Sequence, residues 1–216
     1  MTEIDTSVPH SARIWNYWLG GKGNYPVDEA AGDAYTAVFP GIVTIARSSR
    51  AFLGRGIRYL VLAAGVRQFL DVGTGLPTVD NTHEVAQRHA PEARIVYVDN
   101  DPLVLAHARA LLTSSAEGAT AYEDMSLFEP ERVLGAAGRT LDLTRPTALI
   151  LSGILGHVAD HDRARDLVRR LMAGLPSGSH LCGNDGSRGT DPDYEAAPDG
   201  TAPQPIGQHG GLARKP

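Results

Sequence analysis

The sequence predicts an α/β fold, with a largely parallel sheet and helices on both of its faces. Two observations predict this fold. Short apolar runs rich in branched residues alternate along the chain with helical patterns, and two of these runs end in an acidic residue close to the start of a helix. The connections between parallel strands are expected to be right-handed. Sheets of this kind bind ligands at the carboxyl ends of their strands. A small-molecule site at that edge is therefore the leading functional hypothesis.

Four apolar runs are expected to be strands, and a weaker fifth run is expected to join them. The four cover residues 66–72, 94–98, 147–152 and 179–182, and the fifth covers residues 120–123. Their lengths and their branched or aromatic content are typical of strands that are buried on both faces. They predict the core of the sheet.

Helical patterns separate these strands, and the helices begin with capping signals. The helices are expected over residues 81–89, 102–112 and 158–175. Asn81 is a typical N-cap residue and Glu84 follows three residues later, which is the pattern of a capping box. Asp101 precedes Pro102, and this pair suits the N-cap and the first turn of a helix. Both of these helices therefore begin just after a strand ends.

Residues 1–65 are expected to form a helical cap ahead of the first strand. The pattern is helical from residue 11 onward and is broken at three places by glycine or proline. Trp15 and Trp18 lie in its first part, and packing against the sheet is their expected role. Gly21 and Lys22 belong to a glycine-rich turn that follows, and a turn with so little side chain lets the backbone approach a ligand closely. Both are candidate ligand contacts.

Residues 66–183 are expected to form the core, and residues 184–216 an irregular or disordered tail. Apolar periodicity stops after Gly183, and the remaining chain is rich in glycine, proline, aspartate and serine. Residues 199–216 show no strand pattern. The tail therefore leaves it in question whether an edge of the sheet is covered.

Composition narrows the class of protein. A chain of 216 residues can bury a core without disulfides, and its one cysteine, Cys182, lies in an apolar segment. A buried thiol is typical of a reducing compartment, so a cytoplasmic location is expected. No apolar run is long enough to span a membrane. The first residues lack the charged-then-apolar pattern of a secretion signal, so none is expected. The formal net charge of −5 counts against a nucleic-acid partner.

A glycine-rich turn after the first strand is the most informative motif. Gly73 and Gly75 flank Thr74 and leave room for a ligand, and Asp71 is expected to carry its charge toward the same cleft. A dinucleotide site would need a third glycine, which the three residues after Gly75 do not supply. An acid that opens the loop suits a ligand with a positive amino group better than it suits a phosphate. S-adenosylmethionine has that group and no phosphate.

Acidic residues also follow the next two strands. Asp99 lies 24 residues after Gly75, where the ribose of a bound nucleoside would sit. Asp101 is better explained as an N-cap, which leaves Asp99 as the ribose ligand. Asp124 follows the weak strand and can accept a hydrogen bond from an adenine amino group, with Met125 against the ring face. The alternative for Asp124 is a turn or capping role.

Three histidines and one serine are further candidates, for catalysis, for metal binding or for the lining of the cleft. His83 lies beside the glycine-rich turn and can act as a general base, and the alternative is a hydrogen-bonded helix residue. His157 and His161 are four residues apart, but no third ligand lies nearby, so no metal site is expected. Ser152 ends a strand and can line the cleft. It lacks the Gly-x-Ser-x-Gly context of a hydrolase nucleophile.

Four motifs carry a resemblance to a known family. They cover residues 12–22, 69–78, 81–87 and 96–102. On these motifs the chain resembles a bacterial family of S-adenosylmethionine-dependent methyltransferases long catalogued as a domain of unknown function, from about residue 11 to residue 185. The resemblance implies a Rossmann-like class I methyltransferase with its cofactor against the loop from Asp71 to Gly75, Asp99 and Asp124. Asn100, in the last motif, is a further candidate cofactor contact.

Two features depart from the family pattern. Members usually continue with an aromatic-rich segment that resembles the last strands of a seven-stranded sheet, so the last strands are in question here. Gly156 stands where relatives have a bulkier residue, so His157 transfers only weakly as a substrate-side residue.

The expected reaction is methyl transfer to an unidentified, small-molecule acceptor. An O, N or C atom of the acceptor would attack the sulfonium methyl group in line, so the enzyme mainly holds two reactants in place. Two alternatives are a nicotinamide-dependent oxidoreductase and a catalytically silent module that binds S-adenosylmethionine. The sequence leaves the acceptor and the oligomeric state open.

Overall fold

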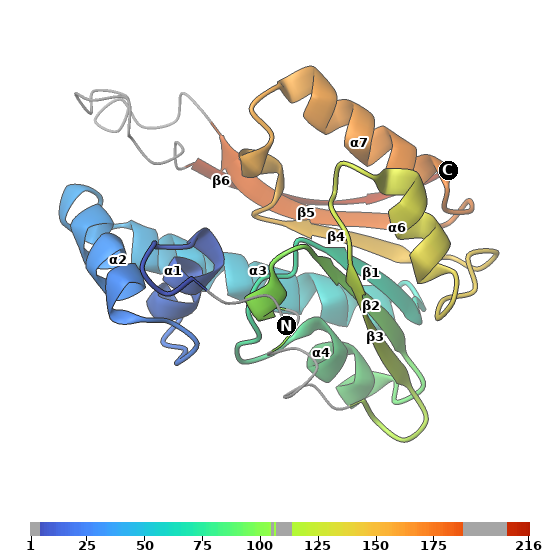
Figure 1. Cartoon of the computed structure of the whole chain (residues 1–216). Helices are drawn as coiled ribbons and strands as arrows, with labels where there is room; N and C mark the ends of the chain where they lie inside the picture. The colour runs from blue at the N-terminus through green and yellow to red at the C-terminus, as the bar shows by residue number, and fades with distance from the viewer. Residues whose placement is uncertain (1–4, 105, 107–113, 188–206) are drawn as a thin grey trace.

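A six-stranded sheet with the order β3-β2-β1-β4-β5-β6 forms the centre of the computed structural model, which describes residues 5–104, 106, 114–187 and 207–216 (Figure 1). The strands are β1 Gln68–Val72, β2 Arg94–Asp99, β3 Ala119–Asp124, β4 Ala148–Ser152, β5 His180–Ser187 and β6 Gly207–Arg214. Neighbours from β3 to β5 are parallel, and β6 is antiparallel to β5. The predicted α/β fold and its five strands are confirmed.

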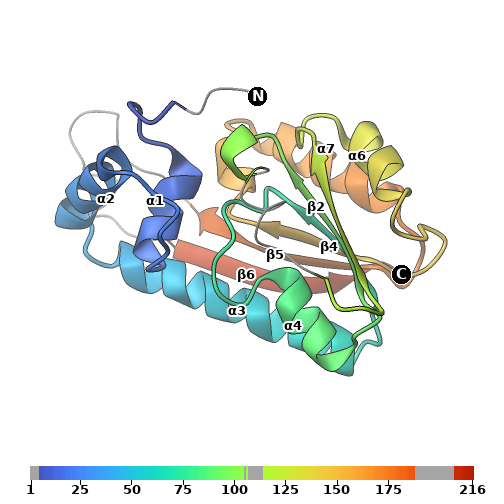
Figure 2. The ribbon, with the colours of Figure 1, turned by 60° about the horizontal axis from the view of Figure 1, so that its bottom comes forward.

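Helices cover both faces of this sheet. The helices in the described part of the chain are α1 Ser11–Trp18, α2 Pro26–Val38, α3 Ile42–Leu62, α4 Thr82–His89, α6 Pro130–Ala137 and α7 His161–Ala173, with a short 3₁₀ helix, η1, at Leu155–His157. The helices α3 and α4 lie on one face, and α6 and α7 lie on the other (Figure 2). The sequence reasoning did not predict α6. Of the helix expected over residues 102–112, only residues 102–104 and 106 are described, and they are helical.

Local signals at the helix starts are confirmed. The amide of Asn81 donates to Glu84 Oε2 at 2.8 Å, and a full capping box begins α4. Helix α7 begins at His161, three residues later than the predicted start. Its N-cap is Asp160, whose Oδ1 accepts hydrogen bonds from the amides of Asp162 and Arg163. These caps fix where each helix starts relative to the strand before it.

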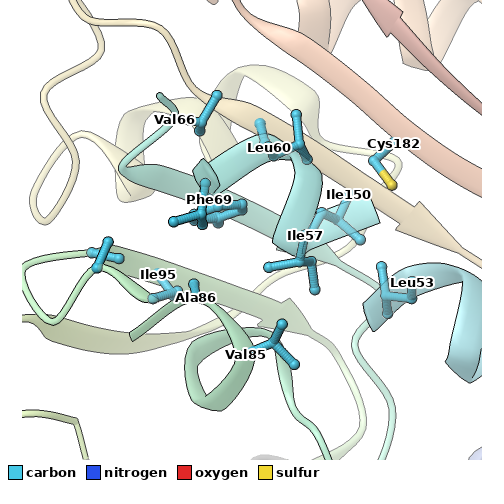
Figure 3. Packing of buried hydrophobic residues seen from close by; sticks show 14 of the residues in the cluster. Leu53, Ile57, Leu60, Val66, Phe69, Val85, Ala86, Ile95, Ile150 and Cys182 are labelled. Carbon is cyan, nitrogen blue, oxygen red and sulfur yellow. The ribbon is translucent and has the colours of Figure 1, made fainter. Parts of the chain in front are cut away.

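The core consists of two apolar layers, one on each face of the sheet. Phe69 and Ile150 point to one face and pack with Ile57 of α3 (Figure 3). The alternate residues Leu70 and Leu149 pack on the other face, with the apolar side of α7. Cys182 is part of the first layer, and burial raises the pKa of its thiol to about 11. The buried thiol is confirmed, and the reducing compartment stays a prediction.

The N-terminal helices form a third, smaller cluster. Trp18 is buried against Ile42 and Ala46 of α3, and its ring meets that of Trp15 edge-on at 5.6 Å between centroids. The prediction that both tryptophans pack against the sheet was wrong, because the residues in their cluster belong to the helical segments and the turns between them. A buried ion pair of 3.0 Å between Arg13 and Asp28 joins α1 to α2.

The prediction of an irregular tail over residues 184–216 was wrong in two segments, residues 184–187 and 207–214, which are strands. β5 continues to Ser187, and β6 pairs with its whole length, from His180 opposite Arg214 to Ser187 opposite Gly207. Because β6 is rich in glycine, it has little apolar pattern. Its glycines let it lie close to α3, where a Cβ atom on Gly210 would approach Phe52 to 2.8 Å. Residues 188–206 lie outside the described residues.

β6 therefore covers the edge of β5 that the sequence left in question. The boundary expected at residue 65 stays a prediction, whereas the one expected at residue 183 falls inside β5. Within the described ranges, no helix has the length and apolar character needed to cross a lipid bilayer.

Candidate functional site

A cavity of about 330 Å³ opens at the carboxyl edge of the parallel strands. The sheet edge forms one wall of this cavity, and helices α1 and α3 form the other. Residues from the strand ends and the loops that follow them are Gly73, Thr74, Gly75, Leu76, Thr78, Asp99, Asn100, Asp101, Ser126, Leu127, Phe128, Ser152, Gly153, Ile154, His157 and Val158. Residues from the helical segment are His10, Ser11, Ala12, Trp15, Asn16, Leu19, Ala46, Ser49, Arg50 and Leu53. We call these two sets the sheet-edge wall and the helical wall.

The glycine-rich turn forms the base of the sheet-edge wall. Gly73 and Gly75 have φ angles of +73° and +64°, which L side chains rarely adopt. The amide of Gly73 donates to the carbonyl of Val98 at 2.8 Å, so the turn is fastened to β2. A Cβ atom on Gly73 would overlap Ile154, whereas one on Gly75 would meet open space. The turn therefore presents backbone to the cavity, as predicted.

Asp99 stands at the end of β2 and faces this turn. Its Oδ2 accepts a hydrogen bond of 2.9 Å from the amide of Gly75, and its Oδ1 accepts one of 2.9 Å from the amide of Asp101. Burial raises the pKa of Asp99, and these backbone hydrogen bonds oppose the rise. Asp101 caps the next helix through the amide of Leu103 at 2.8 Å, which confirms its predicted role. Asp99 is thus held rigidly at the cavity.

Asp71 does not face the cavity, and this prediction was wrong. In the sheet register Asp71 lies opposite Tyr97, two residues before Asp99, so it is still inside the sheet rather than at its edge. Its carboxylate is buried and accepts a 2.6 Å hydrogen bond from the Thr82 hydroxyl. Burial raises the pKa of Asp71 to about 6, against the opposing effects of Thr82 and Arg50. Asp71 thus lies in β1 just before the turn and connects this strand to Thr82 of α4.

The two candidate histidines have different surroundings. His83 is 3% exposed, and its Nδ1 lies 2.9 Å from the Tyr97 hydroxyl, away from the cavity lining. Burial lowers the pKa of His83. The alternative of a hydrogen-bonded helix residue is therefore confirmed for His83. His157 lies in η1, is exposed, and lines the cavity together with Ser152.

Four other predicted contacts lie outside the cavity lining. Asp124 is exposed and lies opposite Asp99 in the register of β3 and β2, and Met125 packs with the layer under α6 and α7. The three residues that follow them line the cavity instead. Gly21 and Lys22 do not line it either. The adenine contact of Asp124 and Met125 stays a prediction.

The glycine-rich turn after α1 wraps around the side chain of Asn16. Asn16 Oδ1 accepts hydrogen bonds from the amide of Gly23 at 2.9 Å and from Asn24 Nδ2 at 3.0 Å. A Cβ atom on Gly21 would overlap the Asn16 amide group. The turn therefore needs glycine to enclose Asn16, which itself lines the cavity.

Arg50 on α3 is the main residue that the sequence reasoning missed. Its guanidinium lines the cavity and donates to the Thr78 hydroxyl, and its buried Nε has no hydrogen-bond partner in the described part of the chain. Burial lowers the pKa of Arg50, and the charge of Asp71 opposes this. A signal was present, since Arg50 lies four residues after Ala46 and three before Leu53 on the buried side of α3.

Comparison with known proteins agrees with this geometry. The profile of a family described as S-adenosyl methyltransferase matches residues 1–214. A DUF574 family protein from Streptomyces avermitilis is 38% identical with a TM-score of 0.90, and the match covers 99% of this chain and 100% of that one. A candidate methyltransferase from Thermobifida fusca is 40% identical with a TM-score of 0.80, over 88% and 71% of the two chains. No curated protein matches.

These matches agree with the resemblance noted in the sequence and give no support to a nicotinamide-dependent oxidoreductase. The chain therefore belongs to the S-adenosyl methyltransferase family and is an S-adenosylmethionine-dependent methyltransferase.

Proposed function

We propose that the protein transfers a methyl group from S-adenosylmethionine to a small molecule held in the cavity between the sheet-edge wall and the helical wall. The observation that carries this proposal is the cavity itself, which joins the glycine-rich turn and Asp99 to a helical wall. Its volume of about 330 Å³ is within the range of pockets that hold small molecules. When bound, the cofactor supplies a methyl group on a positively charged sulfur.

The sheet-edge wall fits the adenosyl part of the cofactor. A carboxylate has about four acceptor positions, and on Asp99 the amides of Gly75 and Asp101 use two, with a smaller contribution from the amide of Asn100. The others are available to the ribose hydroxyls. Because Gly75 has open space where a side chain would be, a ligand can lie directly against its backbone. This supports Asp99, Asn100 and the turn from Gly73 to Gly75 as the cofactor contacts.

The helical wall supplies a charge for the amino-acid part. Arg50 is a cavity-lining cation whose buried Nε lacks a hydrogen-bond partner within the described residues. Buried charges in proteins are normally paired, and a guanidinium fits a carboxylate especially well. We assign Arg50 to the carboxylate of the cofactor.

The remainder of the cavity is suited to an acceptor with an apolar body. Trp15 lines it from α1, and Leu19 lines it just after the end of that helix. Phe128 and Val158 line it from loops that follow β3 and β4. Of the candidate histidines, His157 alone lines the cavity, which supports it as the residue that accepts a proton from the acceptor. Alignment of the two reactants is the main contribution of the enzyme.

The central test compares two acids in register on neighbouring strands. Calorimetric titration with S-adenosylhomocysteine, the product of the cofactor, measures affinity for the wild type, Asp99→Asn and Asp124→Asn. Loss of charge-assisted hydrogen bonds should weaken binding to Asp99→Asn by about 1.5 to 3 kcal/mol. The Asp124 variant removes the same charge at an exposed position outside the cavity lining, and it should bind normally.

Unchanged affinity in Asp99→Asn would remove Asp99 from the site. Weakened binding in Asp124→Asn alone would instead favour the predicted adenine contact. To separate an enzyme from a silent module, methyl-labelled cofactor is mixed with small acceptors that have an apolar body and a nucleophilic O or N atom. Binding of the cofactor without labelling of any acceptor would favour the silent module.

A further inference from the structure

A second cavity, of about 420 Å³, lies at the opposite edge of the sheet, where the parallel strands begin. It shares no lining residue with the first cavity. Its walls come from the end of α3 and from the first or last residues of β1, β5 and β6. Its lining includes Arg67, Arg145, His180 and Arg214. Cavities of this volume hold small molecules.

The charged residues of this lining are all basic. Arg67 is compensated, since its Nε pairs with Glu92 at 2.6 Å and its Nη1 donates to the carbonyls of Val61 and Val66. Within the described ranges, Arg145 and Arg214 form no ion pair.

Asp142 is the acidic residue nearest to Arg145 in the sequence. Hydrogen bonds from Thr144 chiefly lower the pKa of Asp142, and the charge of Arg145 contributes a smaller part. Asp142 does not line the cavity. The cavity therefore retains positive charge.

His180 supplies a second, independent observation. It is 6% exposed, and its Nδ1 is buried with no hydrogen-bond partner among the described residues. Burial, together with the charge of Arg214, lowers the pKa of His180, and a hydrogen bond between the ring and the backbone of Gly178 opposes this. An unpartnered buried nitrogen is costly, and in native proteins it usually has a protein, water or ligand partner.

The strand register brings His180 and Arg214 together. They are directly opposite one another in the antiparallel pair of β5 and β6, so their side chains lie on the same face of the sheet. Both line the cavity, and Arg145 joins them from the loop before β4. A guanidinium is the side chain best suited to bind phosphate oxygens, and a neutral imidazole can donate one further hydrogen bond.

We infer that this second cavity binds a small phosphorylated compound through Arg145, Arg214 and His180. The phosphate oxygens accept hydrogen bonds from the two guanidinium groups and from the ring of His180. The site lies on the far edge of the sheet from the proposed methyl-transfer cavity, and its occupation does not require the cofactor.

Pyrophosphate is the probe for this site, with affinity measured by calorimetry at constant ionic strength. The double variant Arg145→Gln/Arg214→Gln should bind pyrophosphate at least tenfold more weakly than the wild type. The matched control is Arg165→Gln/Arg169→Gln, which removes two positive charges from exposed positions on α7. This control should bind normally, as should Arg50→Met, which changes only the first cavity.

A second measurement follows the ring of His180 directly. In the wild type, its NMR signals should shift when pyrophosphate is added, and the pKa of the ring should rise because the bound anion favours the charged form. No binding at millimolar pyrophosphate, equal weakening in both double variants, or loss of binding in Arg50→Met would each overturn the inference. Unchanged His180 signals would remove His180 from the site.

Discussion

The two walls of the first cavity are built in different ways. The sheet-edge wall consists of residues at strand ends and in the loops that follow them. Hydrogen bonds such as that from the Gly75 amide to the Asp99 carboxylate fix it. The helical wall consists of residues such as Trp15 and Arg50, which are far apart in sequence and meet only when α1 and α3 pack. The first wall is a local property of the sequence, whereas the second depends on tertiary packing.

Asn16 joins the two walls. Its side chain is buried and lines the cavity, and its Oδ1 holds the turn after α1. Its Nδ2 donates to the carbonyl of Pro77, between Leu76 and Thr78 of the sheet-edge wall, at 3.5 Å. On the other side, Arg50 donates to Thr78, which follows the glycine-rich turn of the sheet-edge wall. The helical wall is thus fastened to the sheet by a few polar side chains, and substitutions should affect the two walls differently.

The largest effect is expected in the sheet-edge wall, for Gly73→Val. A branched side chain at φ +73° costs about 1 to 2 kcal/mol in backbone strain. Its overlap with Ile154 adds about 1 to 3 kcal/mol. The free energy of unfolding, measured with denaturant, should therefore fall by about 2 to 5 kcal/mol. Gly75→Ala is the control, because it has similar strain and open space, and a loss as large as that of Gly73→Val would contradict the packing argument.

The second effect concerns Asp71, which lies behind the sheet-edge wall. Its pKa is raised from 3.8 to about 6 in the folded protein, so the folded state binds this proton more tightly than the unfolded chain. The contribution of Asp71 to stability is therefore fully present below pH 3.8 and is lost as the pH rises to about 6. A shift of this size corresponds to about 3 kcal/mol.

Unfolding of the wild type and of Asp71→Asn at a series of pH values measures this loss. The stability of the wild type relative to the variant should decrease from pH 4 to pH 7, and then remain constant. A constant difference across this range would show that Asp71 is not held in a buried, weakly solvated environment.

The third effect tests the helical wall, through Arg50→Met. If Arg50 binds the cofactor carboxylate, S-adenosylhomocysteine should bind more weakly by about 1.5 to 3 kcal/mol, because a charge-assisted hydrogen bond is lost. The affinity for 5′-methylthioadenosine, which has no amino-acid part, should not change. Arg47→Met is the matched control, since Arg47 is exposed on the same helix and lies outside the cavity lining. Equal weakening for both ligands would mean that Arg50 only shapes the cavity.

The difference between the walls also explains how far the sequence predicted the site. The strands, the capping box at Asn81 and the turn from Gly73 to Gly75 depend on neighbours in the chain, and all were predicted. The hydrophobic pattern locates a strand end only to within a residue or two. This uncertainty is enough to place Asp71 wrongly at the edge of the sheet, whereas Asp99 does lie at the end of its strand. The sequence did not predict β6, because its glycine-rich residues have no apolar alternation. Its strand conformation depends on pairing with β5, which the sequence of β6 alone does not show.

Arg50 illustrates a different limit. Its position on the buried side of α3 was visible in the spacing of Ala46 and Leu53. The spacing does not show what that side of the helix faces, which here is partly a cavity and partly the core. A charged residue on an apolar helix face indicates a polar site but does not locate it.

The smallest effect is expected for Lys22→Ala, in the turn that the sequence predicted as a ligand contact. Lys22 is exposed and does not line the cavity, and the turn encloses Asn16 through the amide of Gly23. An exposed substitution of this kind changes stability by at most about 0.5 kcal/mol. Calorimetry should show nearly unchanged cofactor affinity in Lys22→Ala and reduced affinity in Asn16→Ala, which removes the group that joins the two walls. If Lys22→Ala weakened binding strongly while Asn16→Ala did not, the turn itself would belong to the helical wall, and local sequence would have located part of that wall after all.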